Sequence, residues 1–462
     1  MKRFVTIGAA VLLSACAATP ESKLPEHRLP SAYPGVTAAP ASSPLASDWW
    51  TLFNDPALNR MVDATLVHNT DLRLAVARVD AAAAALGVVR SANWPSVDLG
   101  AAATRSRVST LNGQPAPVAG AESSTHRLAL SSSFEIDLWG RLRNADAQAQ
   151  AELLAAQHGR DTVRLALAGS TAQLYFGLRS LDAQLAVIDA QLRARQEGLQ
   201  IVERRLAAGV ASTLEQAQAR AALAATSAAQ PELRRQRALL AHQLGEITGQ
   251  AGLSIEPVAA ALPAPVAVPA GLPSALLVQR PDVQQAEASL RAAQAQVAVA
   301  RAAMFPTLSL TGSFGGQSAD LADLFKGGAR IWSIGPSLLL PLFDGGRNVA
   351  RTEQARAQAE QVAINYQKVV QTAFREVADA LVSAEQGERQ ESEVEMQREA
   401  AGEALRIARR RYEVGYSGYL EVLDAERGAQ DAELARLRAR QVRLDASVAL
   451  MKSLGGGWSA PR

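Results

Sequence analysis

Few side chains in this sequence could perform chemistry, and the most specific of them is the single cysteine, Cys16. A short cationic start at residues 1–3 and an apolar run over residues 4–13 precede it, as in a secretory signal peptide. Ser14 and Ala15 stand directly before the cysteine, the context in which a bacterial signal peptide is cleaved and the new N-terminus is acylated with fatty acids such as palmitate. An ordinary signal peptide, or a buried cysteine in a short helix, would also fit this pattern.

The other reactive residue types do not form a recognisable site. No metal-ligand spacing links the five histidines, which are His27, His68, His126, His158 and His242. The glycine-rich stretch at residues 312–316 lacks the lysine of a phosphate-binding loop, and the sequence holds no G-x-S-x-G. The sequence therefore predicts a protein that is not an enzyme, with no metal and no other cofactor. The balance of 47 Lys+Arg against 45 Asp+Glu argues against nucleic acid as a partner.

The signal peptide sends the chain out of the cytoplasm, and Ala17 predicts the outer membrane. An aspartate at this position commonly retains bacterial lipoproteins in the inner membrane, and the chain has alanine instead. Nothing after residue 15 approaches the ~20 apolar residues of a membrane-spanning helix. If the mature chain crosses a membrane, we therefore expect it to do so with strands.

Two copies of one large unit make up most of the chain. Asp71 and Arg90 match Asp282 and Arg301 at an offset of 211 residues. Further along, an offset of 206 pairs Gly140 with Gly346, Gly209 with Gly415, and Gly249 with Gly455. A shorter loop between two strands would produce this change of offset. The period is far longer than that of solenoid repeats, so we interpret the chain as a tandem duplication.

Each copy is predicted to contain a helix, two strands and two further helices. The first helices are expected at 71–92 and 282–303, where Pro95 and Pro306 end them. Proline-free stretches at 141–208 and 347–414 predict helices about 100 Å long. Gly209 and Gly415 then permit tight turns, and return helices are expected at 213–248 and 418–454. Pro231 predicts a kink or break in the first return helix.

The predicted strands alternate between apolar residues and hydroxyls, glycines or carboxylates. The apolar positions are Val97, Leu99, Ala101 and Ala103; Leu128, Leu130, Phe134, Ile136 and Leu138; Leu308, Leu310, Gly312 and Phe314; and Trp332, Ile334, Leu338, Leu340 and Leu342. A soluble, half-buried sheet would show the same alternation. Several strands approach the ~10 residues of outer-membrane strands, but four strands cannot close a barrel. Because an open edge cannot lie in lipid, other subunits must complete it, and three copies would supply twelve strands.

The chain resembles the outer membrane factors, the TolC-like channels of Gram-negative tripartite systems, and in particular the lipidated NodT-type subgroup. The resemblance covers nearly all of the mature chain. It rests on Trp49-Trp50, Phe53 to Leu58, Asn69 to Leu72, Trp94-Pro95, Gln279 to Val283, Phe305-Pro306, Pro341 to Arg347 and Gly415 to Glu426. It implies a TolC-like trimeric α/β-barrel fold of the membrane α+β class. In that fold each subunit gives four strands to a twelve-stranded barrel, above a long periplasmic α-helical barrel.

The duplication gives predicted domain boundaries. These are a signal peptide at 1–15, a lipidated tail at 16–54, a first outer membrane efflux repeat at 55–249, a connector at 250–274, a second repeat at 275–455 and a C-terminal tail at 456–462. Within the repeats the β-hairpins are expected at 96–139 and 307–343, and the long helices at 141–248 and 347–454.

The resemblance implies an outer membrane channel of a tripartite efflux system. It would be a passive exit for small molecules such as drugs, driven by an inner-membrane resistance-nodulation-division pump through a periplasmic adaptor. The expected partners are two further copies of the chain, the adaptor, the pump and outer membrane lipid. A structural coiled-coil lipoprotein that tethers envelope layers remains an alternative, as does the exit channel of a one-step protein secretion system.

The two turns between the long helices carry the predicted sites. The resemblance implies that Gly209, Val210, Ala211, Ser212 and Gly415 contact the adaptor, although both glycines fit equally well as simple turn residues. The second turn is richer in tyrosine than the first, so we place a gate there. Its predicted residues are Tyr412, Tyr416 and Asp424, with Arg410 and Arg411 as possible partners. Packing of these tyrosines between neighbouring helices is the competing interpretation.

Overall fold

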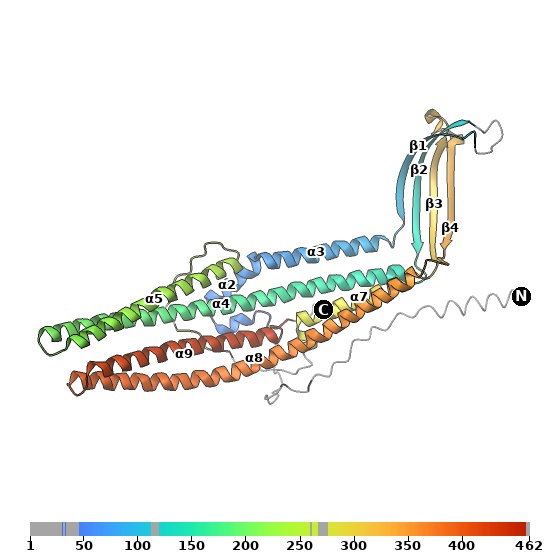
Figure 1. The fold of residues 1–462 in the computed structure, drawn as a ribbon. Helices are drawn as coiled ribbons and strands as arrows, with labels where there is room; N and C mark the ends of the chain where they lie inside the picture. Colours follow the sequence, from blue (N-terminus) through green and yellow to red (C-terminus); the bar gives the residue numbers. More distant parts are fainter. Residues whose placement is uncertain are drawn as a thin grey trace. The chain divides into compact units, whose positions relative to one another are not determined.

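The computed structural model describes residues 30, 33, 46–111, 120–258, 261–266 and 276–458. The predicted signal peptide, Cys16 and most of the predicted tail lie outside these residues. Figure 1 shows the order of the elements. They are η1 (Trp49–Phe53), α2 (Pro56–His68), α3 (Thr70–Ser91), β1 (Ser96–Arg107), β2 (Glu122–Ile136), α4 (Arg141–Ala207), α5 (Thr213–Ile247), α6 (Leu276–Gln279), α7 (Pro281–Ala302), β3 (Thr307–Ser318), η3 (Leu321–Asp323), η4 (Gly327–Ala329), β4 (Arg330–Leu339), α8 (Arg347–Glu413) and α9 (Tyr419–Ser453).

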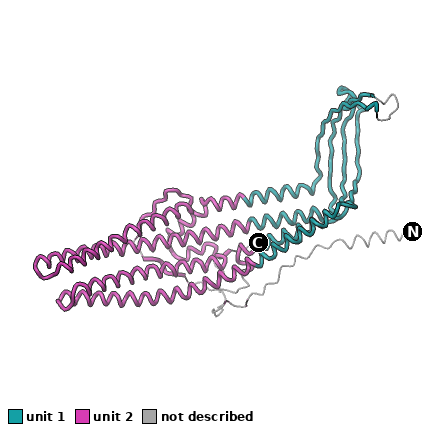
Figure 2. The backbone as a smooth tube through the Cα atoms, viewed as in Figure 1, with its two compact units in different colours: residues 1–26, 78–156, 285–367 teal, residues 27–77, 157–284, 368–462 magenta. Residues whose placement is uncertain are grey.

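The chain divides into two compact units, which Figure 2 colours separately. The first unit holds the four strands and the helical residues that flank them, from 78–156 and 285–367. The second holds η1, α2, the two hairpins of long helices and their turns, from 27–77, 157–284 and 368–462. The long helices α4 and α8 each have residues in both units.

One antiparallel sheet in the order β1-β2-β3-β4 carries all four strands of the described chain. The prediction of two hairpins, one from each repeat, is confirmed. Strands β2 and β3 join the hairpins, with Leu130 opposite Phe314 and Phe134 opposite Leu310. Within the described residues, β1 and β4 each have a neighbour on one side only, so both edges of the sheet have free backbone groups.

The two repeats have helices of matching length. Helices α4 and α8 each span 67 residues, and the return helices α5 and α9 each span 35. The observed ends of all six main helices lie within one residue of the ranges predicted from the sequence. The match follows from the helix-terminating residues of each repeat, since proline ends the first helix and glycine ends the long one.

In each repeat, a side chain near the start of the repeat donates a hydrogen bond to the end of the return helix. The Asn69 side-chain amide donates to the Ile247 carbonyl at 2.8 Å, and the Arg280 guanidinium donates to the Ser453 carbonyl at 3.0 Å. In the duplication Asn69 is equivalent to Arg280, and Ile247 is equivalent to Ser453. The glycines that follow have positive φ, and a Cβ at Gly455 would lie 2.1 Å from a backbone oxygen. Glycine is therefore needed where the end of each return helix meets the start of its repeat.

Of the kink or break predicted at Pro231, the break does not occur. Helix α5 continues through Pro231 from Thr213 to Ile247. Proline removes one backbone hydrogen bond, but contacts with α4 hold the helix on both sides of it. Gln230 donates to Asp189 of α4 at 2.5 Å, and Arg237 pairs with Asp182 of the same helix. Tertiary contacts therefore outweigh the local preference.

Sequence reasoning missed helix α2, although its start is marked. Asp55 accepts hydrogen bonds from the Ala57 and Leu58 amides, and Pro56 occupies the first turn. The second carboxylate oxygen of Asp55 accepts a bond from the Tyr175 hydroxyl at 2.8 Å. This start docks α2 on the principal core of the second unit. That core is formed by Trp49, Trp50, Phe53, Leu58, Val62, Ala168, Ala172, Tyr175, Phe176, Leu444, Val448 and Met451.

None of the described helices combines the length and the apolar character that a membrane crossing requires.

Candidate functional site

The register of the sheet separates its residues into two faces of different chemistry. Residues directly opposite each other across neighbouring strands lie on the same face. One such row consists of Leu99, Leu130, Phe314 and Trp332. The adjacent row on the opposite face consists of Asp98, Ser131, Ser313 and Ser333. The hydroxyls of Ser313 and Ser333 lie 2.8 Å apart within it. The sheet therefore has one apolar face and one polar face.

The apolar face is exposed in the single chain. Trp332 is 74% exposed, Ile334 is 70% exposed, and Leu99 is 68% exposed. Leaving so many large apolar side chains in water is unfavourable, at about 25 cal/mol for each Å². Such a face needs lipid or another protein surface against it. The polar face has the hydroxyls and glycines expected of a wall that contacts water.

The turns between the long helices form the second candidate region. We define tip 1 as residues 203–220 and tip 2 as residues 409–426, which are equivalent at the offset of 206. Both turns contain a glycine with positive φ, 71° at Gly209 and 84° at Gly415. In tip 1 the Val210 amide donates to the Arg205 carbonyl, and in tip 2 the Tyr416 amide donates to the Arg411 carbonyl. The two tips thus share one backbone turn, the Schellman type.

The tips differ in how the return helix begins. Ser212 and Glu215 form a capping box at the start of α5, each side chain accepting from the other's backbone amide. Gly418 occupies the equivalent position before α9 and has no side chain to accept such a bond. Glu421 lies 3.8 Å from Arg411 instead. The first turn of α9 therefore lacks the local cap that α5 has.

Tyrosine contacts hold tip 2 against the first hairpin. The Tyr412 ring lies beneath the Arg205 guanidinium, with 4.7 Å between the guanidinium carbon and the ring centre. It also lies 5.4 Å from the Tyr419 ring, which packs in a cluster with Val202 and Ala219 of the first hairpin. Burial raises the pKa of both tyrosines, so their hydroxyls stay neutral at physiological pH.

The other predicted gate residues are exposed in the single chain. Tyr416 is 81% exposed. The Asp424 carboxylate pairs with Arg427 at 3.0 Å, and Arg410 and Arg411 lie near Glu413 and Glu421. The structure therefore does not bring these four residues together with Tyr412. Tyr412 fits the competing interpretation of packing between helices, and the exposed four are available to a neighbouring molecule.

Four of the five predicted adaptor contacts lie on tip 1, and the fifth, Gly415, lies on tip 2. Val210 is 66% exposed, and Gly209, Ser212 and Gly415 are also exposed. Ala211 is half-buried and packs against the cluster around Tyr419. Ser212 combines exposure with its role in the cap.

Sequence reasoning missed an ion pair in each hairpin. The acidic and basic residues exchange places between the two pairs. Glu203 of α4 pairs with Arg220 of α5 at 3.0 Å. At the equivalent positions of the second repeat, Arg409 of α8 pairs with Glu426 of α9 at 2.9 Å. The reversal was visible at the offset of 206 in the sequence.

The reversed polarity adds a contact between the two hairpins. The second carboxylate oxygen of Glu426 lies 3.8 Å from the Arg195 guanidinium of α4. The Arg195 side chain is only 7% exposed, and its Nε and Nη1 make no hydrogen bond within the described part of the chain. Glu426 is thus the nearest compensating charge for a buried arginine.

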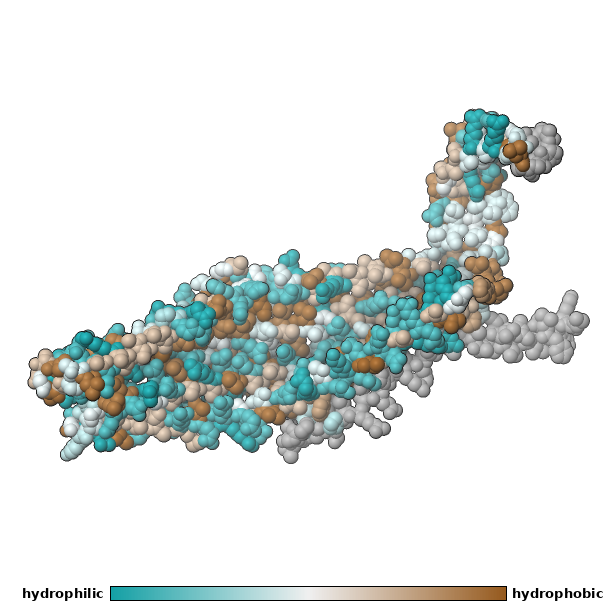
Figure 3. Space-filling model, viewed as in Figure 1, coloured by the Kyte–Doolittle hydropathy of each residue, from teal (hydrophilic) through white to brown (hydrophobic). Residues whose placement is uncertain are grey.

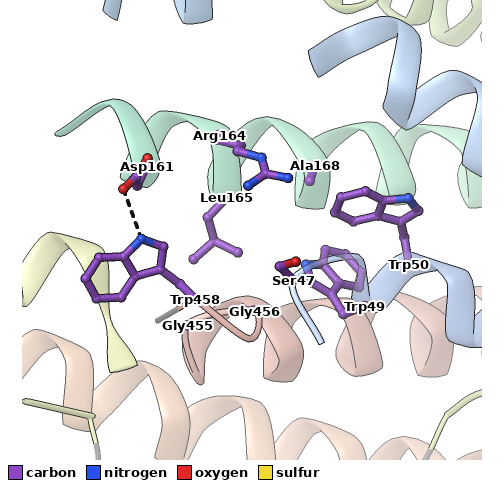
Figure 4. A pocket seen from close by; sticks show the side chains of 10 residues that line it. All are labelled: Ser47, Trp49, Trp50, Asp161, Arg164, Leu165, Ala168, Gly455, Gly456 and Trp458. Atoms are coloured by element: carbon purple, nitrogen blue, oxygen red, sulfur yellow. Dashed lines mark hydrogen bonds between the residues drawn. The ribbon is translucent and has the colours of Figure 1, made fainter. Parts of the chain in front are cut away.

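A cavity beside η1 is too small for a substrate. Figure 4 shows it between α4 and the residues that follow α9, with the Trp458 indole donating to Asp161 at 3.0 Å. Its volume of about 30 Å³ suits one water molecule, whereas ligand pockets measure about 300–1,000 Å³. The described residues contain no cluster of three or more metal-binding side chains.

Comparisons with known proteins agree with these features. The family model described as "Outer membrane efflux protein" matches residues 61–250 and 272–456. The chain is 32% identical to the outer membrane protein OprJ of Pseudomonas aeruginosa, covering 98% of this chain and 95% of OprJ. It is 33% identical to the toluene efflux pump outer membrane protein TtgC of Pseudomonas putida, covering 97% and 94%. The CmeC outer membrane channel of Campylobacter jejuni has a similar structure, with a TM-score of 0.87, 26% identity, and 97% and 96% coverage.

Proposed function

Because the chain belongs to the outer membrane efflux protein family, we propose that it forms the outer membrane channel of a tripartite efflux system. In this proposal three copies assemble, and their twelve strands close one barrel. A periplasmic adaptor connects the channel to an inner-membrane pump of the resistance-nodulation-division class, which supplies the energy. The protein itself is a passive exit and not an enzyme.

One observation carries this proposal, namely the two-faced sheet with free edges. Each unpaired backbone group would cost several kcal/mol in lipid, so β1 and β4 need partners there. A second copy of the chain offers the complementary edge, since β4 of one copy can pair with β1 of the next. Closure then directs the apolar face to lipid and the polar face to the lumen.

The sheet also argues against the structural tether. A tether that joins envelope layers needs long helices but has no use for an apolar sheet face. The secretion alternative shares the fold, and two relatives named for efflux pumps favour export of small molecules. We therefore propose apolar drugs and solvents as the class of substrate.

The decisive experiment measures conductance of the purified trimer in a planar bilayer. We expect discrete channel events from a species of three chains. A protein that is silent and monomeric in detergent would contradict the channel function. Expression in a strain that lacks its own channel should then restore resistance to small antibiotics, whereas restored export of a protein only would favour the secretion alternative.

We propose that tip 1, together with Gly415 of tip 2, contacts the adaptor. In this proposal the tips, at the C-terminal ends of α4 and α8, lie on the periplasmic side of the membrane. Photo-crosslinkers at Val210 and Ser212 should capture the adaptor in cells. Capture only from residues 105–125 would reverse this orientation.

We propose that Cys16 is acylated and that the sheet is the main membrane anchor. The test replaces residues 1–16 with the signal peptide of a protein that has no lipid anchor. The unlipidated protein should remain in the outer membrane fraction. Recovery of this protein from the soluble periplasm would show that the strands do not hold it in the membrane.

We propose that the gate lies at tip 2, where Tyr416, Asp424, Arg410 and Arg411 are exposed to neighbouring subunits. Each of these side chains would occur three times around the axis of the trimer. Tyr412 would contribute indirectly, because its ring holds tip 2 against Arg205 of the first hairpin.

A further inference from the structure

Beyond its apolar rows, the apolar face of the sheet has arginines on both edge strands, Arg105 and Arg107 on β1 and Arg330 on β4. Its successive rows run from Ile136, Leu308 and Leu338 to Ala101, Leu128, Gly316 and Arg330. Ile136 and Leu128 are eight residues apart, which corresponds to about 27 Å along a strand. That length is close to the ~25 Å apolar band of outer membrane barrels. Arg330 therefore stands at the edge of the apolar band.

Beyond Arg330 the same face becomes positively charged. Arg105 and Arg107 lie two and three rows further along β1 than Ala101, and His126 lies one row further along β2 than Leu128. The side chains of Arg105 and Arg107 are 77% and 68% exposed. Figure 3 shows hydrophilic residues gathered at this end of the sheet, where the loops connect the strands.

The positive charges of Arg105, Arg107 and Arg330 are only partly compensated. Glu122 pairs with Arg105 at 2.6 Å and lies 4.0 Å from Arg107. Arg330 forms no ion pair with any residue in the described ranges. Two guanidinium groups on β1 thus share one carboxylate and a third on β4 has no recorded ion pair within the described residues, so an excess of positive charge remains beside the apolar rows.

We propose that Arg105, Arg107 and Arg330 bind the phosphate groups of an outer-leaflet lipid whose acyl chains cover the adjoining apolar rows. A phosphorylated lipid fits both parts of this surface, because guanidinium groups bind phosphate and the apolar rows require acyl chains. A soluble anion would fit only the cationic part. The proposal rests on the orientation of the sheet in the proposed function, with the connecting loops outside the cell.

The sheet supplies a matched control for this proposal. Arg127 on β2 is opposite Ala102 and Gln317, and it lies one residue from the row of Arg330 but on the polar face. It is exposed, as Arg330 is. Arg330→Gln and Arg127→Gln therefore each remove one charge at nearly the same level, from opposite faces.

The test uses the full-length trimer in nanodiscs of neutral phosphatidylcholine with a small fraction of lipid A, a bis-phosphorylated glycolipid. Native mass spectrometry counts the lipid A that stays bound. At ~1 kcal/mol for each cation near a membrane surface, we expect binding to weaken about fivefold in Arg330→Gln and on the order of 150-fold in the triple Arg105→Gln, Arg107→Gln, Arg330→Gln variant. Arg127→Gln should bind like the unaltered protein, and Glu122→Gln should bind more tightly.

Three results would overturn the proposal. The first is an equal loss of lipid A binding in Arg330→Gln and Arg127→Gln. The second is that glycolipid without its phosphates binds as tightly as lipid A. The third is displacement of lipid A by millimolar inorganic phosphate, which would indicate a free-anion site. Conductance recorded from the same preparations keeps the two proposals separate. The triple variant should conduct like the unaltered trimer, and a silent unaltered trimer would count against the channel function alone.

Discussion

Tip 1 and tip 2 have the same backbone turn but are held by different contacts. Tip 1 is closed within its own hairpin, by the Ser212–Glu215 capping box and the Glu203–Arg220 ion pair. In tip 2 the cap is replaced by Gly418, and contacts with the first hairpin are added to the internal Arg409–Glu426 ion pair. Tip 2 is therefore the hairpin end whose stability depends on its neighbour.

This difference shows how a duplication can assign separate roles to two equivalent segments. A segment that moves must be held by contacts that can break without unfolding it. The inter-hairpin contacts of tip 2, made by Tyr412 with Arg205 and by Glu426 with Arg195, meet this requirement. The capping box and the Glu203–Arg220 ion pair of tip 1 are internal and would survive a separation of the hairpins.

The largest expected effect comes from removing the tyrosines of tip 2. Tyr412→Ala with Tyr416→Ala should raise single-channel conductance severalfold and sensitise cells to vancomycin, because the contact with Arg205 and the exposed ring are both lost. The equivalent residues of tip 1 provide the control, and Leu206→Ala with Val210→Ala should do much less. Tyr412→Phe keeps the ring over Arg205 and should stay closed.

Equal conductance changes from the two tips would remove the basis for placing the gate in tip 2. So would unchanged conductance in a tyrosine variant that still assembles as a trimer.

The second effect concerns the reversed ion pairs. Exchanging Arg409→Glu with Glu426→Arg gives the second hairpin the polarity of the first. It keeps a pair within the hairpin but places a second guanidinium beside the buried Arg195. We expect a loss of about 3 kcal/mol in the free energy of unfolding, together with more frequent channel opening. Chemical denaturation and bilayer recordings measure the two quantities.

The matched exchange in the first hairpin, Glu203→Arg with Arg220→Glu, should change both quantities little. Both of its residues are substantially exposed, and such surface pairs contribute little to stability. Similar losses in the two exchanged variants would show that Arg195 does not depend on Glu426.

The sequence predicted features that local rules determine. Strand alternation and the paired glycines located the sheet and both turns, because each depends on residues close together in the chain. The sequence left a break at Pro231 open because contacts of α5 with α4 are not visible in local preferences. Tyr412 and Tyr416 could not be separated by sequence either, since only the packed hairpins show that one is covered and the other exposed.

The ion pairs of Glu426 could be predicted only in part from the sequence. The reversal of charge at residues 203, 220, 409 and 426 was readable from the duplication. The third partner was not, because the residue equivalent to Arg195 in the second repeat is Ala401 and gives no matching signal. Internal comparison therefore finds differences between the repeats, and the structure is needed to show which of them contact each other.

The smallest expected effect comes from giving tip 2 the cap of tip 1. Gly418 has φ −78° and ψ 162°, which serine adopts readily, and the space around it is open. Glu421 already stands three residues later, so Gly418→Ser completes the sequence of a capping box. We expect about 0.5 kcal/mol of added stability and slower hydrogen exchange at the first amides of α9. If local fraying of this turn contributes to opening, channel events should also become rarer. The converse change, Ser212→Gly, should speed exchange at the start of α5 without altering conductance. An effect of Ser212→Gly on conductance as large as that of Gly418→Ser would mean that both tips move, and the division of roles between them would be wrong.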